Sequence, residues 1–161
     1  MNPTEELLEG WTVALDDAVA EVFESMLQRS CAPTQRASSA RADICATITF
    51  SGHLESLCVV QFDTPSAQQL TSAFLGSSEP KHEQAILADS VGELCNMVAG
   101  GWKKRLGCPP WCADLSVPAI ALHPESGPPQ VYTAAIRRVY LFDDADFVVS
   151  LTTPREPDHS V

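Results

Sequence analysis

The sequence predicts an α+β fold in which a mostly antiparallel sheet packs against two long helices and one short helix. Apolar residues recur with the helical period in three segments and with the strand period in five. These segments come in blocks, in the order helix, hairpin, two helices and a run of three strands. Such blocks are typical of α+β proteins, whereas a doubly wound parallel sheet alternates strand with helix. We expect one domain over residues 1–154 and a polar tail at 155–161, since 161 residues are close to the size of one domain.

Two of the helices are predicted in the first half of the chain. Over roughly residues 4–28, apolar side chains recur at steps of three and four, which indicates an amphipathic helix lying on the sheet. A short helix is expected to begin with Thr64 as its N-cap and Pro65 at its first position, and to end at Gly76. The apolar residues of the first helix are Leu8, Trp11, Leu15, Val19, Val22 and Met26.

A second long helix is expected from a start signal at residues 78–80 to about Leu106. Three cations in its last turn favour this end, because positive charge stabilises the C-terminal end of the helix dipole. The apolar stripe that we expect to face the core consists of Leu87, Val91, Leu94 and Val98. A different, exposed face carries Asp89, Glu93, Asn96 and Gly100.

Alternation of apolar and polar residues predicts the strands. The first two form a hairpin, because a short turn at residues 51–53 separates them. A proline, Pro118, lies at the start or on the edge of the third strand. Strands are expected at 44–50, at about 57–62, at 117–122, at 131–142 and at 146–153, with a loop at 31–42 and a polar turn at 143–146.

The charge of the chain excludes two classes of partner. It has 21 acidic and 10 basic residues, a net charge of −11, whereas binding to nucleic acid or to an anionic membrane needs a basic surface. We therefore expect no nucleic-acid and no membrane partner. The first residues lack the basic and apolar regions of a signal peptide, and no apolar run approaches the roughly 18 residues of a membrane span. A cytoplasmic location is the resulting expectation.

Cysteine and metal chemistry has little support in the sequence. Its six cysteines are expected to be reduced thiols, because no secretory signal is present. Cys108 and Cys112 are either a redox or metal pair or ordinary cysteines, and their three-residue gap differs from the usual two. No phosphate-binding glycine loop, zinc-protease motif or nucleophile elbow occurs, and the four histidines are scattered. We expect the chain to bind no metal and no cofactor of its own.

One short pattern carries polar groups suited to catalysis. Asp89, Glu93 and Asn96 are four and three residues apart, so a helix places all three on one face. The only other asparagine is Asn2 near the start, which makes Asn96 the carboxamide available for chemistry. Cys95 lies about 100° further around the helix and is expected to pack inward. On this pattern alone, a solvated helix face is the alternative interpretation.

These residues resemble the signature of a known family. The spacing of Asp89, Glu93 and Asn96, with Pro118 about twenty residues later, is similar to that of the CheC, CheX and FliY chemotaxis phosphatases, which dephosphorylate the response regulator CheY. Pro118 lies one residue nearer Asn96 than in the family pattern. Residues 18–27 resemble the first helix of CheX-type domains, and the order of elements is similar over most of the chain. Because a second motif of the CheC type is missing, the resemblance is to the CheX side of the family.

The resemblance implies a CheC-like fold and hydrolysis of the aspartyl phosphate of a CheY-like receiver domain. Asn96 would position the attacking water, and Glu93 would pair with a lysine of the receiver, which would also supply Mg²⁺. Gly100 would contact the same partner, and Asp89 would either contact it and tune the site or only solvate the helix. A homodimer joined through its sheet is also expected, since the strands at 131–153 would form an open edge if left unpaired.

Three alternatives stay open. The chain could be a CheX-like adaptor that binds a receiver or a flagellar or signalling partner without dephosphorylating it, which phosphate loss from a receiver would decide. It could be an unrelated α+β sensory module, which a closed ligand pocket would favour over an exposed polar helix face. Within the second long helix, Gly100 and Gly101 either allow another backbone to approach closely or bend or end the helix early.

Overall fold

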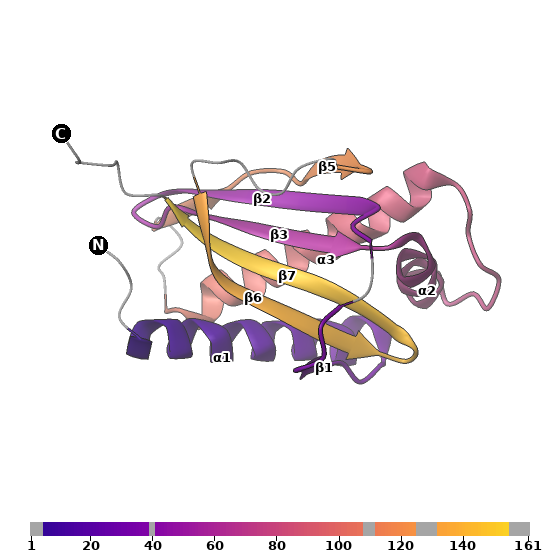
Figure 1. The fold of residues 1–161 in the computed structure, drawn as a ribbon, viewed down its shortest axis with the longest axis horizontal. Helices are drawn as coiled ribbons and strands as arrows, with labels where there is room; N and C mark the ends of the chain where they lie inside the picture. The colour runs from indigo at the N-terminus through magenta and orange to yellow at the C-terminus, as the bar shows by residue number, and fades with distance from the viewer. Residues whose placement is uncertain (1–4, 39–40, 108–111, 125–131, 155–161) are drawn as a thin grey trace.

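The computed structural model describes residues 5–38, 41–107, 112–124 and 132–154. It has the predicted α+β class, with a seven-stranded sheet in which every pairing is antiparallel (Figure 1). The helices are α1 (Glu5–Val22), the π-helical turn η1 (Phe23–Leu27), α2 (Thr64–Leu75) and α3 (Gln84–Arg105). The strands are β1 (Ala32–Thr34), β2 (Ile44–Gly52), β3 (Ser56–Phe62), β4 (Ala113–Leu115), β5 (Ala119–Leu122), β6 (Tyr132–Phe142) and β7 (Ala145–Pro154).

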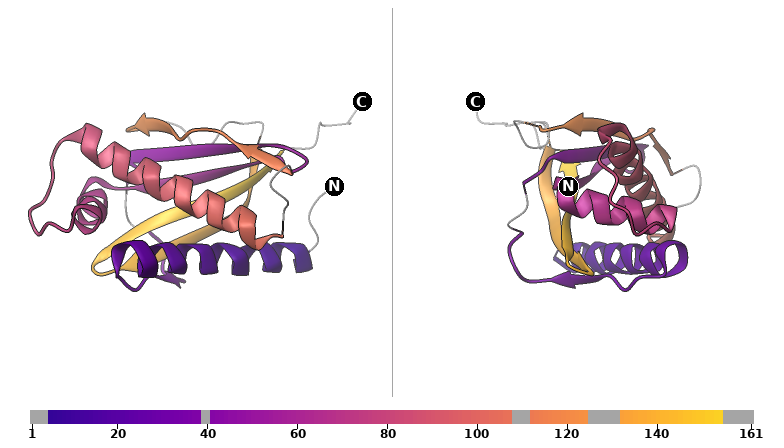
Figure 2. Two further views of the ribbon diagram at one scale, coloured as in Figure 1. Left: turned by 180° about the vertical axis from the view of Figure 1, so that it is seen from behind. Right: turned by 90° about the vertical axis from the view of Figure 1, so that its right-hand side faces the viewer.

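The sheet brings the short strands β4 and β5 to the edge of β2. The strand order is β1-β6-β7-β3-β2-β4, and β5 also pairs with β2. β4 pairs with Phe50–Gly52 at the end of β2, and β5 pairs with Ile44–Thr47 at its start. The long helices α1 and α3 cover the same face of the sheet (Figure 2). As a result, α3 runs next to β5, and residues far apart in the sequence form one surface.

The core lies between the sheet and the helices. The side chains of β2 that alternation predicts to point inward are all buried: Ile44, Ala46, Ile48 and Phe50. The predicted stripe of α3 is buried too: Leu87, Val91, Leu94 and Val98. At the far end of α3, Trp102 packs edge to face against Trp11 of α1, and its indole N–H donates to the Trp11 carbonyl at 3.1 Å. Both long helices are therefore fixed to each other as well as to the sheet.

Three helix boundaries differ from prediction. The first helix ends in the π-helical turn η1, where the chain leaves the α-helical repeat. The N-cap of α2 is Asp63 rather than Thr64, because the Asp63 carboxylate accepts the Ser66 N–H at 2.8 Å, while Gly76 ends the helix as predicted. The helix α3 begins at Gln84 rather than at 78–80. Side-chain hydrogen bonds hold the preceding loop against α2, including one from the Ser72 hydroxyl to the Glu79 carbonyl.

The sheet contains two strands that were not predicted. The expected loop at 31–42 includes β1, an edge strand that pairs with the end of β6 and accommodates Pro33 on the sheet edge. β4 lies between the predicted second long helix and the predicted strand at 117–122, where no strand is expected, and it pairs with β2. β5 is shorter than the expected strand at 117–122 and begins after Pro118. The other long strands are confirmed, and the predicted tail at 155–161 lies outside the described residues.

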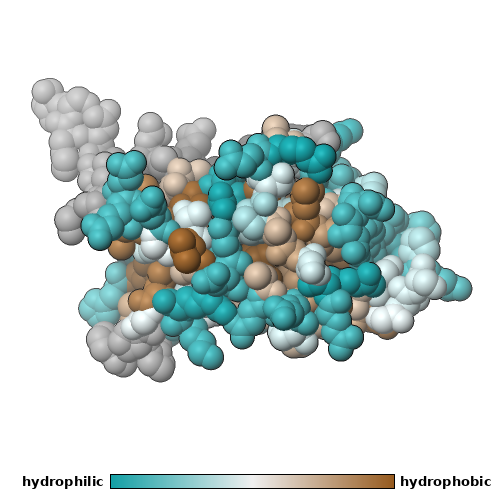
Figure 3. Space-filling model, turned by 90° about the horizontal axis from the view of Figure 1, so that it is seen from below, coloured by the Kyte–Doolittle hydropathy of each residue, from teal (hydrophilic) through white to brown (hydrophobic). Residues whose placement is uncertain are grey.

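The surface formed by α1 carries separate hydrophobic patches among hydrophilic side chains (Figure 3). Its exposed apolar residues include Leu7, Val13 and, in η1, Met26. No helix in the described part of the chain is long and apolar enough to cross a membrane.

Candidate functional site

The polar motif lies on the solvent side of α3. The side chains of Asp89, Glu93 and Asn96 are exposed, and Gly100 is partly exposed, as the helical spacing predicts. Neighbouring positions of the same helix, Leu94 and Cys95, are completely buried. The helix is thus held rigidly by its core side while its polar side stays open to a partner.

A groove of about 560 Å³ runs along this polar side. One wall is α3, and the other is the segment that leads from β4 into β5. The α3 residues lining it are Ala88, Asp89, Gly92, Glu93 and Asn96, and those of the opposite wall are Leu115, Ser116, Val117, Pro118 and Ile120. The structure therefore brings Pro118 to the motif, in spite of its unusual spacing from Asn96 in the sequence.

Gly92 allows the two walls to meet. A Cβ atom at this position would lie 3.2 Å from Cδ1 of Ile120 and 3.6 Å from Cβ of Pro118. A Cβ here would be in tight contact with the Ile120 side chain, which would have to shift by a few tenths of an ångström. Sequence reasoning missed Gly92, Val117 and Ile120 as groove residues. The available signal was a glycine inside a helix, which costs about 1 kcal/mol relative to alanine and so indicates a close neighbour.

The functional groups of the motif are free to bind. Within the described residues, the side chains of Asp89, Glu93 and Asn96 make no hydrogen bond and no ion pair. A carboxamide can donate and accept hydrogen bonds at once, and a carboxylate accepts from cations and N–H donors. The site can therefore hold a water or a polar partner atom at Asn96 and a cation at Glu93.

The groove is acidic. Two carboxylates, Asp89 and Glu93, line it, and no lysine, arginine or histidine is among its described lining residues. The nearest cation further along α3, Lys103, points instead to the end of β4, where its ammonium group donates to the Ala113 carbonyl. The electrostatics of the groove favour a partner that brings positive charge.

A polar cluster fixes the far end of β5. The carboxylate of Asp43 accepts the Thr64 N–H at 2.9 Å and the Thr64 hydroxyl at 3.1 Å, which lowers the pKa of Asp43. His123, directly after β5, donates its backbone N–H to the Asp43 carbonyl at 2.7 Å and holds Nδ1 3.5 Å from the carboxylate. Its Nε2 is 3.3 Å from the amide nitrogen of Gln84, the first residue of α3. These contacts position the second wall of the groove relative to α3.

No described cysteine lines the groove. Cys95 packs inward as predicted, and its thiol points to the carbonyls of Ala46 and Cys58, each at 3.6 Å. The contact with the Cys58 thiol and burial both raise the pKa of Cys95, so its reactive thiolate is suppressed. Cys112 is disulfide-bonded, which corrects the expectation of reduced thiols at this position. Cys108 lies outside the described residues.

No cluster of three or more histidine, cysteine, aspartate or glutamate side chains in the described ranges has the arrangement of a metal site.

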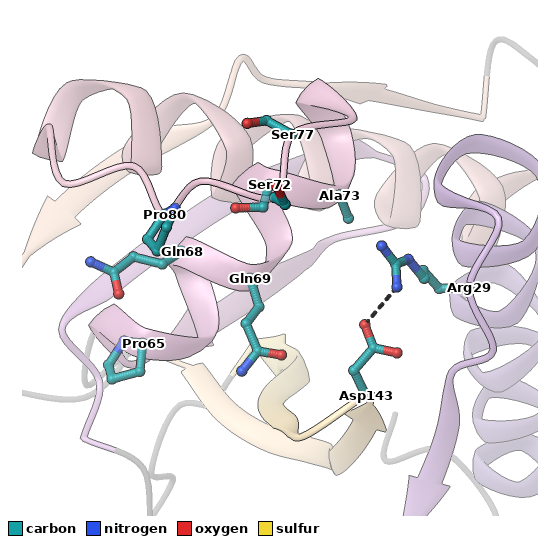
Figure 4. Close-up of a pocket in the computed structure, with 10 residues that line it drawn as sticks. Arg29, Pro65, Gln68, Gln69, Ser72, Ala73, Ser77, Pro80 and Asp143 are labelled. Carbon is teal, nitrogen blue, oxygen red and sulfur yellow. Dashed lines mark hydrogen bonds and ion pairs between the residues drawn. The ribbon is translucent and has the colours of Figure 1, made fainter.

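A second surface pocket, of about 370 Å³, lies between α2, the loop after it and the turn joining β6 to β7 (Figure 4). Its one ion pair joins Arg29 to Asp143 at 3.2 Å, and the glutamine and serine side chains around it make it polar. It contains none of the motif residues. The exposed polar face of α3 disfavours the sensory-module alternative, which calls for a closed ligand pocket.

Comparison with known proteins identifies the family. The model of the family described as "Chemotaxis phosphatase CheX" matches residues 44–134, more than half of the chain. The chain is similar to the chemotaxis protein CheX from Vibrio vulnificus, with a TM-score of 0.71 and 19% identity over 88% of this chain and 94% of that one. It is also similar to a chain of the CheX-CheY-BeF3-Mg+2 complex from Borrelia burgdorferi, with a TM-score of 0.64 and 16% identity over 91% and 98% of the two chains.

FliY from Thermotoga maritima has a related structure, with a TM-score of 0.65 and 16% identity over 97% of this chain and 93% of that one. No curated protein matches the chain significantly by sequence. The likeness to solved structures establishes the CheC-like fold, and the family model covers β2 through the start of β6, including the whole of α3 and both walls of the groove. The chain belongs to the CheX family of chemotaxis phosphatases.

Proposed function

We propose that the protein hydrolyses the aspartyl phosphate of a CheY-like receiver domain. The observation that carries this proposal is a pair of side chains, Glu93 and Asn96, on one exposed face of a helix in a member of the CheX family. Neither has a partner among the described residues. A groove beside them gives a receiver's phosphorylation site room to approach.

Asn96 positions the nucleophile in this proposal. Its carboxamide oxygen accepts a hydrogen bond from a water and its NH₂ group donates to another acceptor, so the water is held in one orientation. The water oxygen forms a bond to phosphorus as the bond between phosphorus and the receiver's carboxylate oxygen breaks. The products are inorganic phosphate and the free carboxylate, with the proton of the water passing to the phosphate or to solvent. Positioning of this kind supplies much of the catalysis in phosphoryl transfer.

Glu93 binds and orients the receiver. It lies one helical turn from Asn96, and its carboxylate is available for the receiver's lysine. Mg²⁺ on the receiver would neutralise charge on the phosphoryl group, so this chain needs to supply no metal of its own. Asp89 and Gly100 extend the contact along the same face of α3.

The direct test is phosphate loss from candidate phosphorylated receivers with and without this protein. We expect faster loss with the parent protein, and no acceleration with the double variant Glu93→Ala/Asn96→Ala. A parent protein that binds a receiver tightly but leaves its phosphate lifetime unchanged would replace the phosphatase with the adaptor function. A parent that neither binds nor dephosphorylates any receiver would refute both.

We propose further that the protein is a homodimer joined through its sheet. The edge formed by β6 supports this, although less of it is open than the sequence predicts. β7 lies inside the sheet, and β1 covers Val139–Leu141 of β6, so of the described residues at 132–153 only the part of β6 before Val139 forms an open edge. Exposed strand edges favour pairing with another chain. A monomeric mass in solution at micromolar concentration would contradict the dimer.

A further inference from the structure

The second wall of the groove carries an apolar surface that the fold leaves uncovered. Of the seven large hydrophobic residues exposed in the described ranges, three lie in the segment from Val117 to Leu122. Val117 is 83% exposed, Ile120 is 39% exposed and Leu122 is 45% exposed. Single exposed apolar residues are common, but a cluster beside a groove indicates an interaction surface. We call Val117, Ile120 and Leu122 the β5 rim.

The sheet register explains why the rim faces the motif. Ile120 pairs with Ala46 and Leu122 pairs with Ile44, and both partners point to the helix-covered face of the sheet. The side chains of Ile120 and Leu122 therefore point to the same side as α3. Because β5 is at the sheet edge, α3 covers them only in part, and Gly92 brings Ile120 into contact with the helix. Val117 and Ile120 line the same groove as Glu93 and Asn96, and Leu122 extends the apolar surface to the end of β5.

The two walls define what kind of partner fits. One wall supplies carboxylates and a carboxamide, and the other supplies aliphatic side chains. A complementary surface places a cation beside apolar side chains. A second copy of this chain is not expected in the groove, because its net charge of −11 opposes the carboxylates there, and the dimer proposed above uses the edge of β6 instead. The same repulsion applies to nucleic acids, as the composition predicts.

We infer that the β5 rim is the apolar half of the docking surface for the receiver domain, and that it recognises aliphatic or aromatic side chains flanking the receiver's lysine. This inference rests on the proposed function and names a feature of its partner. Charge complementarity and continuity with the groove of Glu93 and Asn96 support the receiver as the occupant. The rim contributes affinity and selection among receivers, whereas Asn96 contributes turnover.

The rim also supports the charged contact at Glu93, since it excludes bulk water from the groove when a partner is bound. Apolar burial strengthens the neighbouring contact between Glu93 and a lysine, because charges interact more strongly where water is displaced. The rim and Glu93 should therefore act together in binding. Their effects on the dissociation constant should be non-additive, as is usual for residues that share one contact surface.

The test uses substitutions that keep the branching at Cβ and remove apolar contact. Val117→Thr and Ile120→Thr both retain a β-branched side chain, which suits the strand segment. The matched control is Val13→Thr on α1, which alters an exposed valine on another surface. We measure the dissociation constant for a receiver held in its beryllofluoride-activated, Mg²⁺-bound form, and separately the turnover of phosphorylated receiver at saturating concentration.

We expect the double variant Val117→Thr/Ile120→Thr to weaken binding about tenfold, because it removes two methyl groups and one methylene that the complex would bury. Turnover at saturation should stay within about twofold of the parent, and Val13→Thr should change neither quantity. Thermal unfolding of all three proteins should be similar, since the altered residues are exposed. A receiver that binds the parent and the double variant equally would overturn the inference and leave the proposed function intact.

Failure of the catalytic proposal would give a different result from failure of the docking surface. If Asn96→Ala dephosphorylates the receiver at the parental rate while the rim variant binds tenfold more weakly, the catalytic proposal fails and the docking surface is retained. If the parent shows no binding to any activated receiver, both are overturned. A rim variant that lowers turnover at saturation but not affinity would also overturn the inference, because it would place the rim in the chemical step.

Discussion

The two long helices, α1 and α3, bury apolar stripes on the same sheet face but use their polar side chains in opposite ways. On α1, Asp16 accepts a two-pronged ion pair from Arg138, with atoms 3.1 and 2.6 Å apart, and a hydrogen bond from the Tyr140 hydroxyl at 2.7 Å. Further along α1, Glu21 pairs with Arg105 of α3. On α3, Asp89, Glu93 and Asn96 have no such partners within the described residues.

This contrast separates polar groups that hold the fold together from those available to another molecule. Asp16 stabilises the protonated forms of both its partners. Contact with its carboxylate raises the pKa of Arg138, and burial together with that contact raises the pKa of Tyr140. Removing Asp16 would leave a guanidinium and a phenol without their partner. Removing Asn96 would leave no described residue without a hydrogen-bond partner. Stability and activity should therefore respond oppositely to substitutions on the two helices.

The largest expected effect is that of Asn96→Ala on dephosphorylation. Losing a preorganised contact in the transition state typically costs on the order of 10²-fold in rate, so phosphate loss should fall nearly to the receiver's own rate. Stability should change by no more than about 0.5 kcal/mol, because the site is exposed. Single-turnover phosphate release and thermal unfolding measure the two effects. Lys104→Ala, an exposed change in the last turn of the same helix, should leave the rate at the parental value.

Glu93→Ala should differ from Asn96→Ala in one respect. Its proposed partner is a charged lysine, so truncation leaves that lysine unpaired in the interface and weakens binding as well as turnover. Titration of the activated receiver against each variant distinguishes them. Equal affinities for parent and Glu93→Ala would remove the proposed lysine contact.

The next largest effect is that of Asp16→Ala on stability. Breaking a buried pair costs several kcal/mol, but this pair is partly solvated, so we expect about 2 kcal/mol. For a chain of this size that corresponds to a melting temperature lower by roughly 4–8 °C. Dephosphorylation measured well below that temperature should be unchanged. Asp17→Ala is the matched control, since Asp17 is exposed and has no hydrogen bond or ion pair in the described part of the chain. Equal stabilities of the two variants would contradict the structural role of Asp16.

The motif could be predicted from the sequence because all of its residues lie on one helix. Its position relative to Leu87, Val91, Leu94 and Val98 follows from the helical period, so exposure of Glu93 and Asn96 was predictable. The opposite wall was predicted only in part: a strand was expected at 117–122, where β5 lies, but β4 and the pairing of both strands with β2 were not. β4 and β5 are short, and they exist because they pair with β2 more than 60 residues earlier. Local pattern carries no information about such pairing.

The errors at helix ends have a similar origin. Ser78 to Pro80 has the composition of a helix start, but hydrogen bonds to α2 hold this segment outside α3. Likewise, Thr64 is a good N-cap residue by type, yet Asp63 provides the cap and Thr64 instead donates to Asp43. In each case a tertiary contact decided between two locally acceptable choices. The same Asp43 contacts support the groove, so they were also invisible to the sequence pattern.

Asp43→Asn tests this support through its pH dependence. Hydrogen bonds from Thr64, and secondarily the proximity of His123, lower the pKa of Asp43 in the folded protein. A lowered pKa adds stability that is present above the unfolded value of about 3.9 and is lost as pH falls through the folded value. We expect the variant to lose about 1 kcal/mol at neutral pH, a figure discounted for solvent screening. The difference from the parent should shrink below about pH 4. Chemical denaturation between pH 3 and pH 7 measures it, and a constant difference across that range would contradict the lowered pKa.

The last comparison concerns Gly100 and Gly101, two adjacent glycines of α3. Gly101 packs against α1, whereas Gly100 lies on the open side of the helix. Since α3 continues to Arg105, these glycines do not end the helix. A Cβ at Gly101 would lie 3.3 Å from Cβ of Ala18 on α1, whereas a Cβ at Gly100 would meet nothing within 4 Å.

Alanine in place of glycine stabilises a helix by up to about 1 kcal/mol, so Gly100→Ala should raise stability by roughly that amount. Gly101→Ala gains the same helix term, but Ala18 has no rotatable side chain that could move aside, so overpacking of about 1–3 kcal/mol should offset or exceed the gain. Denaturant midpoints of the two variants measure the difference, which should be at least about 1 kcal/mol with Gly100→Ala the more stable. Equal midpoints would show that α1 and α3 can move apart at this crossing. The packed side of α3 would then tolerate an added methyl group as well as the open side does.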